Sequence, residues 1–169
     1  MKESFRSRLT RWGFNHFPAY RRTGARITHI AADFREVRIK LPLNWTTRNY
    51  VGTLFGASMF GAIDGIHMVM LLKLLGPGYV VWDKAAAIRY KRPGRTTLYA
   101  RISLDEQELE SIRAELTESP KLDRVFQVEI TDEAGNVHAT IERTVQVRRK
   151  DAMSSSTSAT AQQSLRAAA

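Results

Sequence analysis

The sequence predicts an α+β fold in which an antiparallel β-sheet wraps around one long, central apolar helix. The first observation behind this prediction is residues 56–75, a mostly apolar run that is long enough for about five turns of helix. The second is the order of the other segments, with one strand-like segment before the run and four after it. A sheet made from these strands would bury the apolar helix on most sides.

The first half of the chain contains an arm, a strand and the central helix. The first twenty residues predict a short helix or an irregular arm that ends at Pro18. In residues 34–43, FREVRIKLPL, apolar and basic residues alternate with the period of a half-buried strand. A glycine-rich loop then leads into the helix over 56–75, and the breaker GPG at 76–78 ends it.

The second half predicts four strands and one short helix. Residues 79–90 are long enough for a strand, and 96–104 place apolar residues on one face. Residues 105–116 switch to apolar spacings of three and four, which indicates a surface helix. The segments 123–130 and 137–147 alternate well, and the sequence TDEAGN between them predicts the turn of an antiparallel hairpin.

The 169 residues predict one folded domain with an extension at each end. Residues 1–33 are expected to form a basic, helical arm packed on the domain, and residues 34–150 the domain itself. Residues 151–169 lack the apolar content needed to fold alone, so we predict a disordered tail.

The charge of the chain is strongly basic, with a formal net charge of +9. This favours polyanionic partners such as nucleic acid, anionic membrane or coenzyme A. Seven basic residues lie in the first 26 positions against the single acid Glu3. An organellar transit segment has a similar composition, but Phe14, Phe17 and Tyr20 favour an arm that packs.

The residue types exclude some chemistry. The chain has no cysteine, which rules out a thiol nucleophile and suits a reducing cytoplasm, where we expect the protein. The four histidines show no metal-ligand spacing, so no metal is predicted.

Residues 56–75 also have the length of a membrane span. They contain Asp64, His67 and Lys73, and an ionised aspartate near the centre of a bilayer costs several kcal/mol. We therefore predict a buried helix and no transmembrane segment.

The residues around the start of this helix resemble a known signature. Asn49, the triplet Phe55-Gly56-Ala57 and Asp64 fall at the spacings seen in hotdog-fold acyl-CoA thioesterases of the phenylacetyl-CoA branch. There an Asn is followed six residues later by His-Gly-Gly, and an acid lies nine residues after the His. The stretches RNYVGTLFGAS, VVWDKAA and IRYKRPGR also resemble an uncharacterised thioesterase-like subgroup of the superfamily, a domain of unknown function. The resemblance covers 34 to about 150 and implies the hotdog fold.

The resemblance also implies a function and a site. It implies a homodimer, or a dimer of dimers, that hydrolyses an acyl-CoA or acyl-carrier thioester at a site shared between protomers. Asp64 would act as general base or as nucleophile. Backbone N–H groups near Gly56 and Ala57 would bind the oxyanion, and Asn49 would orient water or bind the carbonyl. No cofactor is implied beyond the coenzyme A of the substrate.

Two departures from the signature motivate an alternative. Phe55 stands in place of the His, and Ala57 in place of the second Gly. The chain could therefore be a noncatalytic acyl-CoA or lipid-binding hotdog protein, in which the apolar helix and five methionines line a pocket. In that case Asp64 could be a buried interface carboxylate that is hydrogen-bonded to His67. A third hypothesis is that the basic arm binds an anionic membrane or nucleic acid, but no recognition motif supports nucleic acid.

The residues nearest the helix start have both structural and ligand-binding interpretations. Ser58 lacks the spacing of a nucleophile elbow, so it is expected to cap or pack the helix. His67 is either a packed partner or a group of the site. Lys84 or Arg89 could contact a ligand phosphate, whereas the neighbouring Asp83 favours a structural ion pair with Arg89 or an adjacent strand.

The basic turn KRPGR is the remaining candidate. Its cations could bind the phosphates of coenzyme A, or they could form a solvated turn. The full set of predicted substrate-binding residues is Phe55, Ala57, Ser58, His67, Lys84, Arg89, Lys91, Arg92 and Arg95.

Overall fold

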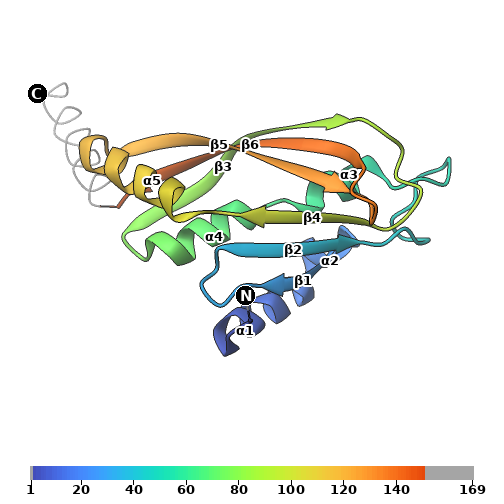
Figure 1. Cartoon of the computed structure of the whole chain (residues 1–169), viewed down its shortest axis with the longest axis horizontal. Helices are drawn as coiled ribbons and strands as arrows, with labels where there is room; N and C mark the ends of the chain where they lie inside the picture. The colour runs from blue at the N-terminus through green and yellow to red at the C-terminus, as the bar shows by residue number, and fades with distance from the viewer. Residues whose placement is uncertain (1, 151–169) are drawn as a thin grey trace, which may run out of the picture.

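The computed structural model describes residues 2–150, and it confirms the predicted α+β class (Figure 1). Six strands form one antiparallel sheet in the order β1-β2-β4-β5-β6-β3. The predicted tail over 151–169 lies outside the described residues. The elements are α1 (Phe5–His16), α2 (Pro18–Arg22), β1 (Arg26–Ile30), β2 (Glu36–Leu41), α3 (Gly56–Ala62), α4 (Ile66–Leu75), β3 (Tyr79–Tyr90), β4 (Leu98–Ser103), α5 (Glu106–Glu118), β5 (Lys121–Thr131) and β6 (Val137–Arg149).

The central helix is interrupted, which the sequence analysis did not predict. Instead of one helix over 56–75, the chain forms α3, a break over 63–65, and then α4. Gly65 in the break has φ +70°, a left-handed conformation that costs glycine little because it has no Cβ. Both helices remain in the core, where Ile63 and Leu71 are completely buried. Asp64 therefore stands in the break and not within a helix.

The segment Gly56–Leu75 is also the one stretch in the described part of the chain with the length and hydropathy of a membrane span. A core helix of a folded domain has the same properties. Here its side chains Ile66 and Met70 pack into the same buried cluster as Ile141 and Val145 of β6.

The first strand, β1, is a second element that the sequence analysis missed. It pairs with β2, but the register shifts between Ile27 and His29. The irregularity places the buried residues Ile27 and Ile30 three positions apart, so the period of two is absent. Figure 1 shows α1 and α2 beside β1, at the edge of the sheet opposite β3.

The second half of the fold follows the sequence prediction. The side chain of Asp105 accepts a hydrogen bond from the N–H of Glu108 and caps α5, whose apolar face is fully buried. Strands β5 and β6 form the predicted hairpin, with Gly135 at φ +84° in its turn.

Strand β3 forms one edge of the sheet, and this matters for the site. It pairs with β6 on one side, and on the other side it has no strand partner within residues 2–150. With twelve residues it is long, and Trp82 and Tyr90 on it are exposed. A long uncovered edge strand is a ready surface for pairing with another chain.

Candidate functional site

Asp64 is held by an arginine from the sheet. Its Oδ1 lies 2.5 Å from Nη2 of Arg143 on β6, while 62% of the Asp64 side chain remains exposed. Oδ2 has no hydrogen-bond partner within residues 2–150. The predicted hydrogen bond between Asp64 and His67 is therefore wrong, because the partner of Asp64 is Arg143; within one chain the carboxylate is exposed.

Arg143 is the residue that the sequence analysis missed. Its side chain is only 3% exposed and lies on the inward face of β6, in line with Ile141 and Val145. Nη2 is shared between Asp64 and Asp83 on β3, whose Oδ2 is 3.3 Å away. The guanidinium also lies over the ring of Phe60, 5.5 Å from its centre. The sequence did contain a signal for this ion pair, because Arg143 occupies an inward position of an alternating strand. A charge at such a position is buried and requires a partner of opposite charge.

The arrangement of these charges explains how a buried arginine is tolerated. Two carboxylates, from the helix break and from the edge strand, offset the cost of removing the guanidinium from water. The structural interpretation of Asp83, an ion pair with a neighbouring strand, is confirmed. Nε and Nη1 of Arg143 are buried and have no hydrogen-bond partner in the described part of the chain.

His67 is a packed residue of the core. It is 3% exposed, and its ring stacks on Phe126 with 4.5 Å between centroids. Burial, together with the positive charge of Arg143, lowers the pKa of His67 to about 4. His67 is therefore neutral near pH 7 and makes no hydrogen bond to Asp64.

Asp64 also lines an apolar cavity of about 540 Å³ between the arm and the helix break. The arm contributes Phe14 and Phe17, and α4 contributes Met68 and Val69. A cavity of this volume is within the range that binds small molecules.

A second cavity, of about 380 Å³, gathers several of the other predicted residues. It is lined by Asn49, Gly56, Lys91 and Arg92, together with Tyr90 from the end of β3. The first turn of α3 has no side-chain cap, and the backbone N–H groups at its start have no acceptor within residues 2–150.

Two residues in this cavity have structural roles that the sequence did not indicate. The side-chain oxygen of Asn49 accepts hydrogen bonds from the N–H groups of Val51 and Thr53, and its amide donates to the Thr53 hydroxyl. Its polar atoms therefore hold the loop. A Cβ added to Gly56 would lie 2.5 Å from the hydroxyl oxygen of Tyr90, so Gly56 makes room for that ring.

The other predicted residues lie elsewhere. Lys84 pairs at 2.5 Å with Asp123 on β5, and this hydrogen bond, followed by one from Gln146, lowers the pKa of Asp123. Arg89 and Arg95 are exposed and line neither cavity.

Around the start of α3, Ser58 is buried and makes no side-chain cap, while Phe55 and Ala57 are exposed. In the described part of the chain, no group of three or more His, Asp or Glu side chains could hold a metal ion.

The comparison with family models identifies the chain. Residues 6–147 match the model described as a domain of unknown function, DUF4442. This chain belongs to the DUF4442 family. No curated protein matches it.

Solved structures place this DUF4442 chain among hotdog-fold proteins. A protein of unknown function from Pseudomonas aeruginosa, described as a probable thioesterase, is 21% identical with a TM-score of 0.74, over 84% of this chain and 95% of that one. A thioesterase from Haemophilus influenzae is 18% identical with a TM-score of 0.63, over 88% and 94% of the two chains. At these identities the likeness shows the fold, and the predicted hotdog fold is confirmed.

Proposed function

We propose that this DUF4442 protein hydrolyses acyl-CoA thioesters, as a homodimer in which each site combines groups from both chains. The observation that carries the proposal is the separation of the predicted groups within one chain. Asp64 lines one cavity, and Gly56 with the basic residues Lys91 and Arg92 lines another. Helix α3 lies between them and spans about 10 Å, so one chain cannot bring both groups to one carbonyl.

Pairing of the β3 edges of two chains would bring Asp64 of one chain close to Gly56 of the other. A two-fold axis through antiparallel β3 strands reverses the direction of α3 in the second copy. Asp64 of one copy would then face the start of α3 in the other. The length and exposure of β3 support this arrangement.

The chemistry assigned to the combined site is attack of water on the thioester carbonyl. Asp64 of one copy takes a proton from water as general base, or attacks the carbonyl itself as nucleophile. N–H groups at Gly56 and Ala57 of the other copy donate to the oxyanion. In the general-base route the carbon–sulfur bond then breaks, the thiolate takes up a proton, and the products are the carboxylic acid and the free thiol. In the nucleophilic route the thiol leaves while the acyl group stays on Asp64 as a mixed anhydride, which water then hydrolyses to the carboxylic acid. Arg143 acts as a positioning residue, because its contact with Oδ1 leaves Oδ2 of Asp64 for the reaction.

The basic cavity supports coenzyme A as the carrier. Lys91 and Arg92 are exposed beside Gly56 and could make charge-assisted hydrogen bonds to phosphate. Lys91 has only a distant partner, with 3.9 Å between its ammonium and Glu129.

Release of free thiol from short, medium, long and aromatic acyl-CoAs tests the proposal. Asp64→Asn is expected to lower kcat by about two orders of magnitude or more. Glu110→Gln, the same change at an exposed acid on α5, should leave the rate unchanged. Equal rates for wild type and Asp64→Asn on every hydrolysed substrate would remove Asp64 from the chemistry.

Mixing two impaired variants tests the shared site. Asp64→Asn lacks the acid, and Lys91→Glu with Arg92→Glu lacks the basic cavity. If the site is shared, a mixture that exchanges chains forms heterodimers with one intact site and regains about a quarter of the wild-type activity. A mixture no more active than its components would exclude a shared site.

Noncatalytic acyl binding is the second candidate, because Phe55 occupies the place of the signature His. Phe55 is the residue before α3 and is 52% exposed, so a His there could reach a ligand. Binding of an acyl-CoA without thiol release would support this alternative. Thiol release that appears only in Phe55→His would show that the substitution removed the activity.

A further inference from the structure

The outer face of α1 carries large apolar side chains in contact with solvent. Phe5, Leu9 and Trp12 are 80%, 58% and 60% exposed, and their spacings of four and three place them on one face of the helix. Trp12 stacks on His16, with 4.5 Å between the ring centroids, which extends this surface by one turn. We call Phe5, Leu9, Trp12 and His16 the outer stripe of α1.

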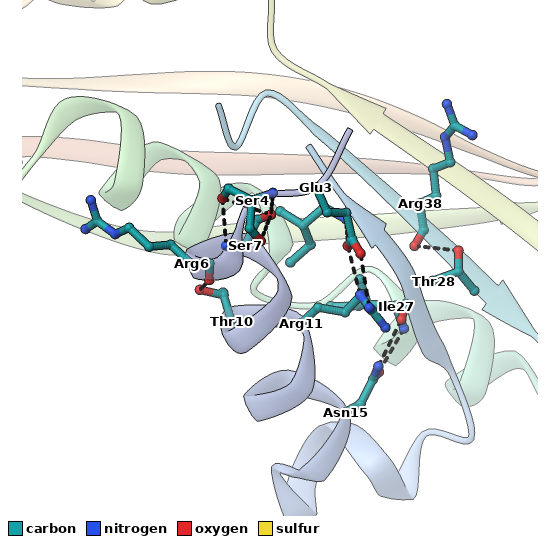
Figure 2. Close-up of polar contacts among 11 residues, drawn as sticks. Glu3, Ser4, Arg6, Ser7, Thr10, Arg11, Asn15, Ile27, Thr28 and Arg38 are labelled. Carbon is teal, nitrogen blue, oxygen red and sulfur yellow. Dashed lines mark hydrogen bonds and ion pairs between the residues drawn. The ribbon is translucent and has the colours of Figure 1, made fainter. Parts of the chain in front are cut away.

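The opposite face of α1 is attached to the sheet, so the outer stripe cannot turn inward. The side chain of Asn15 donates to the carbonyl of Ile27 and accepts from its N–H, both at 2.9 Å (Figure 2). Phe14 packs edge-on against Tyr20, whose hydroxyl donates to the carbonyl of Ala62.

Hydrogen bonds also fix the N-terminal end of α1. Ser4 and Ser7 form a capping box, which Figure 2 shows at the first turn. The carboxylate of Glu3 accepts from Arg11 at 2.8 Å and from the N–H of Ile30 at 3.0 Å. The orientation of the helix is therefore determined at both ends.

Arginines surround the outer stripe, and they are available to an external anion. They are Arg6 and Arg8 on α1, Arg21 and Arg22 on α2, and Arg26 on β1, and all are exposed. None of these five has an ion-pair partner within residues 2–150. Glu3, the only acid before residue 33, is already paired with Arg11.

Four of the five arginines, all except Arg6, line two adjoining depressions together with residues of the stripe. A shallow depression of about 560 Å³ is lined by the outer stripe together with Arg8 and Arg26. A second depression, of about 760 Å³, shares His16 and Arg26 with the first and adds Arg21 and Arg22.

We propose that this surface of α1 and α2 binds the anionic surface of a lipid bilayer. The outer stripe would enter the interfacial region of the bilayer, and the arginines would contact lipid phosphates. An apolar face flanked by basic residues is the pattern of a helix that lies in the plane of a membrane. The proposal does not depend on the thioesterase chemistry.

Charge complementarity favours an anionic bilayer over a second copy of the chain. A two-fold contact through this face would bring the five arginines of one copy toward those of the other. Nucleic acid would satisfy the arginines, but it would leave the apolar stripe between them without a partner. A bilayer surface offers both phosphate and apolar material.

Co-sedimentation with vesicles tests the proposal. Wild type should bind vesicles of phosphatidylcholine mixed with an equal amount of phosphatidylglycerol, and the bound fraction should fall as salt is raised. Binding to phosphatidylcholine alone should be much weaker. No binding to the mixed vesicles at low salt would overturn the proposal.

Charge-matched variants locate the binding surface. Arg6→Ser with Arg8→Ser and Arg21→Ser should weaken binding to the mixed vesicles by on the order of tenfold or more. The control Lys91→Ser with Arg92→Ser and Arg95→Ser removes the same charge elsewhere and should have a much smaller effect. Equal losses in the two variants would show that net charge alone is responsible.

The apolar contact has its own readout. With Trp45→Phe and Trp82→Phe, Trp12 is the remaining tryptophan, and its emission should shift to the blue when mixed vesicles are added. Phe5→Ser with Leu9→Ser should weaken binding more than Tyr50→Ser with Val51→Ser, which changes exposed residues of a loop. An unshifted emission, or stronger binding to duplex DNA or RNA than to vesicles, would overturn the proposal.

Discussion

Arginine has opposite environments in two regions of this molecule. Arg143 is buried in the sheet and shares one nitrogen between two carboxylates. Arg21 and Arg22 on α2 are exposed and have no ion-pair partner within residues 2–150. The difference shows that burial decides what an arginine side chain does in this molecule. A buried arginine positions side chains of its own chain, whereas an exposed and unpaired one is available to an external anion.

The largest expected effect comes from breaking the buried ion pairs. Arg143→Met should lower the free energy of unfolding by about 3 to 5 kcal/mol, because Asp83 would lose its buried partner. Urea denaturation measures the change. Adding Asp83→Asn should recover part of the loss. A loss below about 1 kcal/mol for Arg143→Met alone would mean that the pairs contribute little.

The next effect concerns pH and the histidine beside Arg143. The usual pKa of histidine is 6.5, and that of His67 is lowered to about 4. Above pH 6.5 His67 is neutral in both the folded and the unfolded state, so its protonation costs the folded protein no stability there. As the pH falls from 6.5 to 4, the unfolded state binds a proton that the folded state does not, so up to about 3 kcal/mol of stability is lost.

Unfolding as a function of pH in His67→Phe checks this expectation. The variant keeps an aromatic ring against Phe126 and should lose less stability than wild type between pH 6.5 and 4. Identical curves for wild type and His67→Phe would contradict the assigned pKa.

A smaller effect is expected where an acid attaches the arm to the sheet. Burial alone would raise the pKa of Glu3, but hydrogen bonds from Arg11 and from the backbone of Ile30 lower it. The contact is therefore complete at neutral pH and weakens as the pH falls through the lowered pKa. Glu3→Gln should loosen α1 locally by about 1 kcal/mol, measured as faster hydrogen exchange of its amides. Unchanged exchange would show that Asn15 holds the arm without Glu3.

The smallest effect is expected at the exposed arginines themselves. Arg6→Ser with Arg8→Ser and Arg21→Ser should change the free energy of unfolding by less than about 0.5 kcal/mol per site, because these side chains have no ion-pair partner in the folded chain. Thermal unfolding of the same variant used with vesicles gives the value. A large loss would place these arginines in the fold and remove the contrast with Arg143.

The sequence by itself determined the α+β class and most of the elements. Local periodicity was sufficient for β2, β4, α5 and the β5–β6 hairpin, because each buries one face against a common core. Local periodicity missed β1, where a register shift removes the alternation. It also missed the break over 63–65, where the left-handed Gly65 interrupts an apolar run. The residues around Asn49 and Asp64 also carried the resemblance to the hotdog fold.

Only the tertiary structure decided which groups meet. Arg143 contacts Asp64 and Asp83, which are 79 and 60 positions away in the chain, and no local pattern encodes such a pairing. The side chain of Asn49 forms hydrogen bonds within its own loop, to Thr53. Asp64 and Gly56 line two different cavities. The physical reason is that periodicity reports which face of an element is buried, whereas the partner of a buried charge depends on how sheet and helices pack.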